Sequence, residues 1–346
     1  MDRCIRTWPL AAAVLALALA SSPVVAAAAE DYAKEQVQRQ QDQPGNNEPL
    51  WKEVRSGAPQ VTQVRGIETN VLVLPQGETW RQVRNGPIKI YGGTLLVVML
   101  AAIALFYVRK GEMKLHGSPT GRMILRFSNR ERLVHWGTAI SFSILAVSGL
   151  IILFGRNVVL PLLGLTVFSW LAALAKNLHN FVGPVFTVFL VLLIATFIRN
   201  NLPQKGDWRW ILGFGGLFSG KETPSCKFNA GEKLWFWGGA LTLGTIVAAS
   251  GLVLDFPNFG QGREIMQYAH VIHATAAVCM MAAACGHIYM GTIGMQGAFQ
   301  AMRYGVVDET WAREHHEYWY EAMKSAEANG GRGGSAPLPG VAQREL

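Results

Sequence analysis

The sequence has few charged residues for its length. Only 16% of its 346 residues are Asp, Glu, Lys or Arg, while 50% are hydrophobic, and the mean hydropathy is +0.21. A soluble domain carries about a quarter charged residues, so this deficit argues against an ordinary soluble enzyme. Uncharged runs of about 20 residues alternate with short basic stretches, which is typical of a protein that crosses a membrane several times.

Cysteines are also scarce. Cys4 lies close to the N-terminus, Cys226 lies in a basic loop, and Cys279 and Cys285 lie in an apolar run. The sequence contains neither a C-x-x-C pair nor C-x-x-C-H. These absences exclude a covalently attached c-type haem and argue against an iron–sulfur cluster with cysteine ligands. A redox centre in this chain would therefore need other ligands.

The first 29 residues have the features of a secretory signal peptide. Arg3 and Arg6 precede the apolar residues 10–20, and the segment ends in small residues. We predict cleavage at Ala29, with Ala26 as the alternative, and hence a mature N-terminus in the periplasm. An uncleaved anchor is the other interpretation.

Five uncharged runs predict an all-α integral membrane helical bundle, with five transmembrane helices in the mature chain. Each run can cross a hydrocarbon core of about 30 Å at a rise of about 1.5 Å per residue. The runs are residues 90–108, 133–155, 177–198, 234–254 and 265–302.

Residues 157–175 are apolar too, but they contain Pro161 and Gly164. Arg156 and Lys176 join them directly to the neighbouring spans, which leaves no room for two tight reversals. We predict a loop here, with an interfacial helix on the periplasmic side.

Basic residues are concentrated in the segments between the first and second spans and between the third and fourth spans. Because positive loops face the cytoplasm, the C-terminus is expected inside the bacterial inner membrane and the mature N-terminus outside. The formal charge of +8 therefore indicates topology and predicts no nucleic-acid partner. The basic residues are Arg109, Lys110, Lys114, Arg122, Arg126, Arg130 and Arg132 in one segment, and Arg199, Lys205, Arg209, Lys221, Lys227 and Lys233 in the other.

Four histidines lie in the spans, where a polar ring is costly and indicates a functional site. His135 and His287 lie near cytoplasmic ends, whereas His179 and His273 lie near periplasmic ends. From His273 to His287 the helix rises about 21 Å and returns to within about 40° of the same face. The pattern predicts two b haems whose iron is bound by His135 with His287 and by His179 with His273.

Other interpretations of these histidines remain. His270 is an alternative ligand to His273, which we prefer because it keeps phase with His287. Single histidines can also bond helix carbonyls, bind zinc, or relay protons in a transporter. Zinc would require the four rings in one layer, and we see no internal repeat of the kind that many transporters carry. Three further histidines are predicted to be solvated or to face a partner: His116, His315 and His316.

Small and basic residues near these histidines fit the same hypothesis. Small residues would let a flat macrocycle approach the backbone, although ordinary helix packing explains them equally well; they are Gly137, Gly149, Gly183 and Ala274. Basic residues at the two surfaces could pair with haem propionates; they are Arg130, Arg132 and Lys176.

Several segments resemble the γ subunit of membrane-bound formate dehydrogenase, a diheme cytochrome b556 family. They are RLVHW at 132–136, NLHNFVG at 177–183, VIHA at 271–274, HIYM at 287–290 and WAREHH at 311–316. The resemblance covers roughly residues 125–322, and related cytochrome b subunits serve nickel–iron hydrogenases. The chain differs from the shorter family members in its signal peptide, periplasmic extension and additional first span, so the role of residues 30–110 is open.

The resemblance implies the same two ligand pairs and a quinone beside the cytoplasmic haem. In the family an Asn-Ala-Gly motif contacts the quinone, and here it corresponds to Asn229 and Gly231 around Ala230. Without the resemblance, this stretch has the pattern of an ordinary helix N-cap with a basic flank. The family's partners are an iron–sulfur β subunit and a molybdenum or tungsten catalytic α subunit, and the quinone would be menaquinone or ubiquinone.

We therefore divide the chain into a signal peptide (1–29), a periplasmic extension (30–87), an additional transmembrane helix (88–110), a diheme cytochrome b domain (125–322) and a disordered cytoplasmic tail (323–346). The expected function is electron transfer from a periplasmic iron–sulfur subunit through two b haems to quinone. The chain has no visible site for formate chemistry itself. The alternative function is the cytochrome b anchor of a nickel–iron hydrogenase or another periplasmic oxidoreductase.

Overall fold

The computed structural model describes residues 34, 37–38, 48–58, 75–216 and 223–328. The chain divides into two units, Met1–Pro75 and Gln76–Leu346. Helix α2 (Glu48–Arg55) belongs to the first unit. The expected signal peptide lies outside the described residues.

The second unit begins with one continuous helical stretch, Gln76–Lys110. It consists of α3 (Pro75–Val83), the π-helical turn η1 (Arg84–Ile88) and α4 (Lys89–Lys110). The helix therefore begins about three turns before the boundary expected at residue 88. At the other end of the chain, α12 (Glu317–Ala328) occupies the first residues of the segment that was expected to be disordered.

Between these ends, the chain forms long apolar helices joined by short elements. The remaining elements are β1 (Met123–Leu125), α5 (Asn129–Phe197), η2 (Ile198–Asn201), α6 (Asp207–Leu212), η3 (Phe214–Gly216), α7 (Ala230–Leu234), η4 (Trp235–Leu243), α8 (Gly244–Asp255), α9 (Arg263–Tyr289), η5 (Met290–Gly294), α10 (Ala298–Tyr304), β2 (Val306–Asp308) and α11 (Glu309–His315).

Within the described residues, four helices are long and apolar enough to cross a membrane: Gln76–Lys110, Asn129–Phe197, Ala230–Asp255 and Arg263–Gly294. The second has 69 residues, about three times the length that one crossing needs, and it is interrupted at Gly164. Its halves pack antiparallel, because Gly155 lies against Phe168 and Ser148 bonds His179. The bundle thus has five segments of membrane-crossing length, and it is the all-α membrane bundle that the sequence predicted.

The loop and interfacial helix expected at residues 157–175 are wrong. Both halves of α5 continue through this stretch as regular helix, and only Gly164 leaves the helical region, with φ 76° and ψ 171°. That conformation is essentially restricted to glycine. A single reversal at Gly164 therefore replaces the two that the sequence argument assumed.

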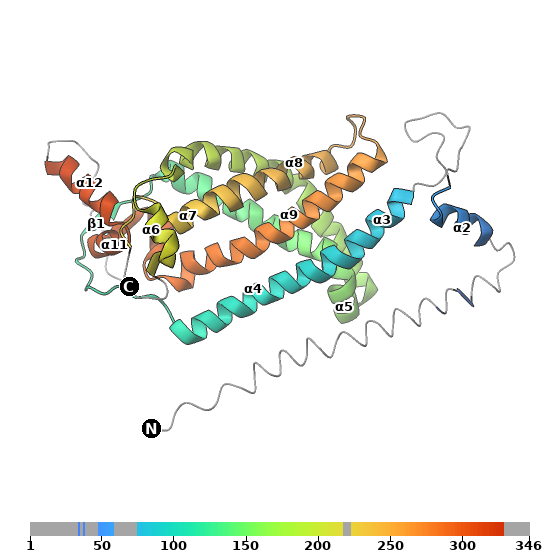
Figure 1. The fold of residues 1–346 in the computed structure, drawn as a ribbon, viewed down its shortest axis with the longest axis horizontal. Helices are drawn as coiled ribbons and strands as arrows, with labels where there is room; N and C mark the ends of the chain where they lie inside the picture. Colours follow the sequence, from blue (N-terminus) through green and yellow to red (C-terminus); the bar gives the residue numbers. More distant parts are fainter. Residues whose placement is uncertain (1–33, 35–36, 39–47, 59–74, 217–222, 329–346) are drawn as a thin grey trace, which may run out of the picture. The chain divides into compact units, whose positions relative to one another are not determined.

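Helices α4, α8 and α9 lie side by side (Figure 1). Helix α8 runs antiparallel to α9, whereas α4 runs parallel to α9, since Gly92 lies against Val278 and Phe106 against Tyr289. We name the two ends of this unit after the helices that lie there. The α3 end carries α3 and the α8–α9 loop, and the α11 end carries α11 and α12 (Figure 1).

Helix starts at the α11 end are fixed by reciprocal caps. Ser128 accepts from the backbone N–H of Glu131, whose carboxylate accepts from Ser128 N–H, and Asn229 and Glu232 repeat the arrangement. Such capping boxes satisfy two otherwise unpaired N–H groups. The first box starts α5, which carries His135 and His179, and the second starts the helical segment that faces α9.

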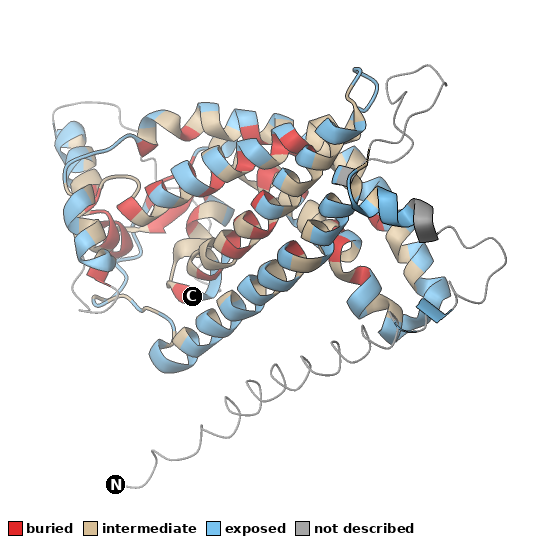
Figure 2. Ribbon diagram, turned by 45° about the vertical axis from the view of Figure 1, so that its right-hand side comes forward, coloured by how far each residue is buried: buried red, intermediate tan, exposed pale blue. Residues whose placement is uncertain are grey.

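Buried residues concentrate in the central helices and at the α11 end, whereas α4 has none (Figure 2). At the α11 end, β1 pairs antiparallel with β2, and a small core forms around Ile124, Phe127 and Trp311. The outward faces of the long helices are apolar and exposed, as lipid contact requires.

Gly305 joins the strands to this core. It follows α10 with φ 86°, and its carbonyl accepts from Arg126 N–H and Phe127 N–H. A Cβ on Gly305 would lie 2.5 Å from the Phe127 carbonyl oxygen. The position therefore requires glycine both for its backbone conformation and for the space around it.

We predict that Gly305→Ala lowers the Tm of the detergent-solubilised protein more than Gly121→Ala. Gly121 has a similar φ of 76°, but a Cβ there would meet no atom within 4 Å, so both variants incur about 1–2 kcal/mol of backbone strain. Only Gly305→Ala adds overpacking, typically about 1–3 kcal/mol. Equal Tm values for the two variants would contradict the close contact.

Candidate functional site

Two pairs of histidine rings face one another inside the bundle. The ring centroids of His135 and His287 are 6.2 Å apart, with 57° between their planes. Those of His179 and His273 are 6.0 Å apart, with 80° between their planes. The structure thus brings together the residues that the sequence analysis paired, the first pair toward the α11 end and the second toward the α3 end.

An apolar layer separates the two pairs. Phe142 follows His135 by two helical turns, and Met280 lies midway between His273 and His287 on α9. Both contact the cluster centred on the fully buried Phe186. Each pair therefore occupies its own level in the bundle, with hydrocarbon between the levels.

The His179 ring is held by a serine on the facing half of α5. Ser148 Oγ lies 2.9 Å from His179 Nδ1 and 2.8 Å from the Ile144 carbonyl oxygen. The single hydroxyl hydrogen of Ser148 donates to that carbonyl, so the oxygen accepts from His179 Nδ1–H. The Nε2 atom of His179 is then left with its lone pair, as a metal ligand requires.

The His273 ring is held in the same way from α8. Its Nδ1 lies 3.0 Å from the Val247 carbonyl oxygen and 3.2 Å from Ser250 Oγ. Ser250 donates to the Ile246 carbonyl oxygen at 2.5 Å, so it too accepts from the imidazole. His273 Nε2 is therefore the free nitrogen.

A glycine follows each of these serines and makes room for the ring. A Cβ on Gly149 would lie 3.3 Å from His179 Cε1, and one on Gly251 would lie 3.1 Å from His273 Cε1. Gly149 was predicted from the sequence to lie near a ligand, whereas Ser148, Ser250 and Gly251 were not. The signal was present, because the dipeptide Ser-Gly occurs in both uncharged runs that face a histidine.

The other small residues fill different roles. A Cβ on Gly137 would overlap the Phe189 ring, so this glycine is a helix packing contact. A Cβ on Gly183 would meet no atom within 4 Å.

The pair toward the α11 end has a different environment. His135 Nδ1 is buried and has no hydrogen-bond partner among the described residues. The His287 ring lies almost parallel to the Trp235 indole, with centroids 4.8 Å apart and 12° between the planes. Aromatic contact, rather than a serine, lines this pair.

His270 points toward another partner. Trp80 Nε1 donates to His270 Nδ1 at 3.3 Å, and the two rings meet edge to face at 5.4 Å. In the structure His179 faces His273, whereas His270 attaches α3 to α9; the choice of His273 as the ligand stays a prediction.

The predicted quinone residues have structural roles in this conformation. Asn229 Oδ1 accepts from Glu232 N–H at 2.9 Å, as an ordinary N-cap does. A Cβ on Gly231 would lie 2.5 Å from the Trp210 ring, so the glycine lets the indole approach the backbone. Contact of these residues with quinone stays a prediction.

The basic residues expected near propionates contact the protein. Arg132 donates to Asn129 Oδ1 and to the Tyr304 carbonyl oxygen, although its Nε is buried without a partner in the described part of the chain. Lys176 Nζ donates to Asn180 Oδ1 at 3.1 Å. Arg130 is exposed.

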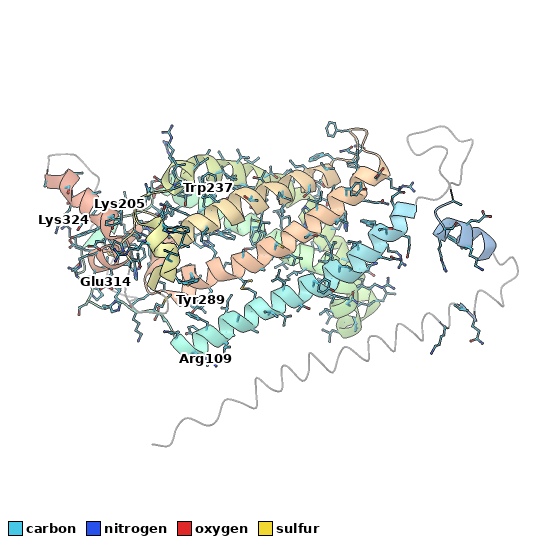
Figure 3. All side chains as sticks on the ribbon, in the orientation of Figure 1. Arg109, Lys205, Trp237, Tyr289, Glu314 and Lys324 are labelled. Carbon is cyan, nitrogen blue, oxygen red and sulfur yellow. The ribbon has the colours of Figure 1, made fainter. Side chains whose placement is uncertain are left out.

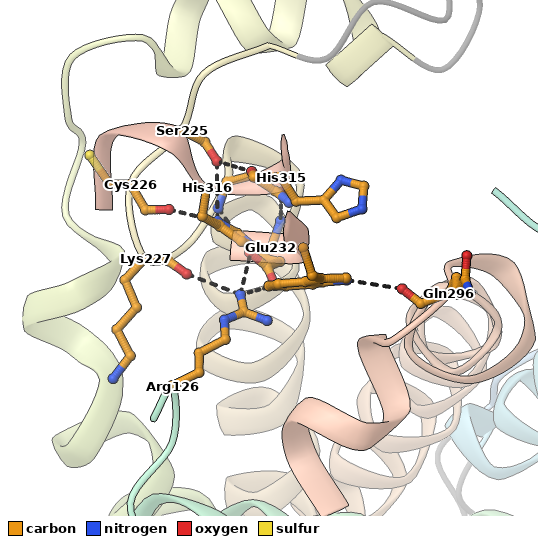
Figure 4. A network of polar contacts seen from close by, with 10 residues as sticks. Arg126, Ser225, Cys226, Lys227, Glu232, Gln296, His315 and His316 are labelled. Atoms are coloured by element: carbon orange, nitrogen blue, oxygen red, sulfur yellow. Dashed lines mark hydrogen bonds and ion pairs between the residues drawn. The ribbon is translucent and has the colours of Figure 1, made fainter. Parts of the chain in front are cut away.

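Polar side chains gather at the α11 end, where Figure 3 labels Glu314, Lys205 and Lys324. A buried network lies beneath them (Figure 4). Arg126 Nη2 lies 3.0 Å from a Glu232 carboxylate oxygen and 2.9 Å from His316 Nε2. A guanidinium only donates, so His316 Nε2 accepts and its Nδ1–H donates to the Cys226 carbonyl oxygen at 2.7 Å.

The expectation that His315 and His316 are solvated is wrong. His315 is 7% exposed and His316 is 1% exposed. Both rings are packed at the α11 end, where Trp311 contacts each of them. Burial and the adjacent Arg126 lower the pKa of His316 from 6.5 to about 3. The expectation holds for His116, whose side chain is 64% exposed.

Comparison with known proteins identifies the bundle. Residues 126–305, just over half of the chain, match the sequence profile described as prokaryotic cytochrome b561. The chain belongs to the prokaryotic cytochrome b561 family. The profile covers all four paired histidines and excludes α3 and α4.

Curated relatives of this cytochrome b561 chain cover the same core. It is 30% identical over 212 residues to the nitrate-inducible formate dehydrogenase cytochrome b556(Fdn) subunit of Escherichia coli K12, covering 60% of this chain and 94% of the relative. It is 31% identical over 210 residues to the cytochrome b556(fdo) subunit of the same strain, covering 58% and 93%. The formate dehydrogenase cytochrome b556 subunit of Haemophilus influenzae is 25% identical over 208 residues, covering 57% and 82%.

Membership of a cytochrome b family implies haem b, and the residues present fit that group. Two imidazoles that bind one iron from opposite sides need centroids roughly 6 Å apart, given metal–nitrogen bonds of about 2 Å. Both pairs meet this spacing. The described residues contain no group of three or more His, Cys, Asp or Glu that could hold a metal ion, whereas haem contributes its own four nitrogens.

We predict that His316→Gln flattens the pH dependence of stability. The pKa of His316 is 6.5 in the unfolded chain and about 3 in the folded protein. Between these values only the unfolded chain binds the proton, so the free energy of unfolding of the wild type decreases as the pH falls, by at most about 1.4 kcal/mol per pH unit. Gln can still accept from Arg126 and donate to Cys226, but it does not titrate.

The measurement is Tm of the solubilised wild type and variant at several pH values between about 7 and about 4. The wild type should lose more stability than the variant over this range. Parallel curves would contradict the buried neutral state of His316.

Proposed function

We propose that this chain is the cytochrome b electron-transfer subunit of a respiratory formate dehydrogenase. The observation that carries the proposal is the two facing imidazole pairs at separate levels of an apolar bundle. The curated relatives, all formate dehydrogenase cytochrome b556 subunits, support the assignment to formate dehydrogenase.

The orientation that we propose follows from charge. The α11 end carries the basic loops and faces the cytoplasm of a bacterium, so the α3 end faces the periplasm. The His179–His273 pair then lies on the periplasmic side of the inner membrane, and the His135–His287 pair lies on the cytoplasmic side.

In this proposal each imidazole pair holds one haem b. Bound haem supplies one-electron transfer, which would connect a periplasmic iron–sulfur subunit with quinone near the cytoplasm. Ser148 and Ser250 hold His179 and His273 in the tautomer that leaves Nε2 free, and Nε2 is the atom that would bind the haem iron. The apolar layer around Phe186 keeps water from the space between the pairs. Formate oxidation itself belongs to a molybdenum or tungsten subunit in this assembly.

Quinone is proposed to bind beside Asn229 and Gly231, as the family resemblance implies. The helix cap engages Asn229 Oδ1, so the side-chain amino group can donate to a quinone carbonyl. The Trp210 ring would have to move from Gly231 to admit a quinone ring there. Menaquinone and ubiquinone are both compatible with this chemistry.

We predict that His287→Leu removes about half of the haem b, because one of two axial ligands is lost at one level only. Reduced-minus-oxidised spectra with haem quantification measure this. The control is His270→Leu, another histidine of α9 that bonds Trp80 and should retain both haems. Full haem content in His287→Leu would contradict the assignment.

Metal analysis of the purified native complex decides between the candidate donors. Molybdenum or tungsten is expected, whereas nickel would make the chain a hydrogenase anchor.

We predict that Ser148→Ala raises the midpoint potential of one haem more than Ser250→Ala does. A hydrogen bond from Nδ1–H makes an imidazole a stronger donor, which stabilises ferric iron. In Ser148→Ala, His179 loses its serine acceptor and keeps only a contact with the Leu145 backbone that falls short of a hydrogen bond. In Ser250→Ala, His273 keeps the Val247 carbonyl at 3.0 Å. A redox titration should show a rise of up to about 59 mV, a tenfold change in the one-electron equilibrium. A larger rise in Ser250→Ala would contradict this account.

A further inference from the structure

The His287 ring is oriented by an aromatic side chain of the neighbouring helix. Trp235 stacks on it with centroids 4.8 Å apart and only 12° between the planes. A stack this close to parallel restricts rotation of the imidazole about its side-chain bond, because the ring would turn its edge into the indole. Among the described side chains, no aromatic ring stacks in this way on His179 or His273. Those two rings contact Ser148 and Ser250 instead.

Trp235 itself has a prepared place. Gly239 follows it by four residues in η4, and a Cβ there would overlap the indole ring. The glycine therefore leaves a slot into which the indole lies flat. Trp235 begins a π-helical stretch of nine residues, and such insertions often occur at functional sites.

The turn before Trp235 is fixed on two sides. Asn229 and Glu232 close the capping box at its start. Lys233 is 5% exposed, and its Nζ bonds both carboxylate oxygens of Asp207, at 2.7 and 2.9 Å. A rigid supporting element of this kind is what precise orientation of a ligand needs.

We propose that Trp235 is a positioning residue that sets the plane of the His287 imidazole, and with it the 57° angle to the His135 ring. The inference rests on the proposed function, in which His135 and His287 are the two axial ligands of one haem. Residues that orient metal ligands tune the metal centre without touching it. Trp235 performs by stacking what Ser148 and Ser250 perform by hydrogen bonding at the other level.

The test is electron paramagnetic resonance of the oxidised, full-length protein, combined with a redox titration. The signal of a low-spin ferric haem depends on the angle between its two axial imidazole planes. Trp235→Leu should shift one of the two low-spin signals and the midpoint potential of the same haem, while the other haem and the total haem content stay unchanged.

Two further variants separate orientation from general damage. Trp235→Phe keeps a flat ring and should restore the signal toward that of the wild type, whereas Gly239→Ala should displace the indole and reproduce the shift. The matched control is Trp237→Leu, in the same η4 stretch, whose indole N–H donates to the Asn201 carbonyl oxygen instead. It should leave both signals unchanged.

The outcomes separate the positioning role of Trp235 from the proposed function. Unchanged signals and potentials in Trp235→Leu, with both haems present, overturn the positioning role and leave the proposed function standing. If Trp235→Leu does not assemble, unchanged signals in Gly239→Ala overturn it equally. A wild-type protein without two low-spin haem signals overturns the proposed function, and the inference with it.

Discussion

The structure depends on one constraint: four imidazole rings are placed among hydrocarbon, where an unsatisfied polar group is costly. The bundle meets that cost differently at its two levels. Toward the α3 end, serine hydroxyls and a helix carbonyl accept from the ring N–H groups. Toward the α11 end, Trp235 stacks on His287, and His135 Nδ1 finds no partner among the described residues. The pairs therefore share a spacing but differ in their surroundings.

The architecture was largely predictable because its signals are periodic and local. Uncharged runs located the membrane helices, and the 14-residue spacing of His273 and His287 indicated their common face and different depth. The reversal at Gly164 could not be predicted, because one residue with a conformation reserved for glycine joins two long helices without a loop. Nothing in the apolar pattern around Gly164 distinguishes that reversal from an interfacial segment.

The sequence predicted which histidines face one another, but it did not predict the side chains that hold them. Ser148, Ser250 and Trp235 contact the histidines across helices, through side-chain geometry that no spacing rule encodes. His316 was missed for a related reason: a histidine in a polar terminal segment is usually exposed, and only the packing of α11 buries it against Arg126. The family profile does not cover His316, which lies beyond residue 305.

The central claim is that the two facing pairs, each with centroids about 6 Å apart, hold one haem b apiece. Haem quantification on the purified, membrane-inserted full-length protein, grown with sufficient iron, tests it most directly. The account predicts two non-covalent b haems per chain with a Soret absorption band. A correctly inserted protein that is colourless, or that binds a single haem, would contradict it.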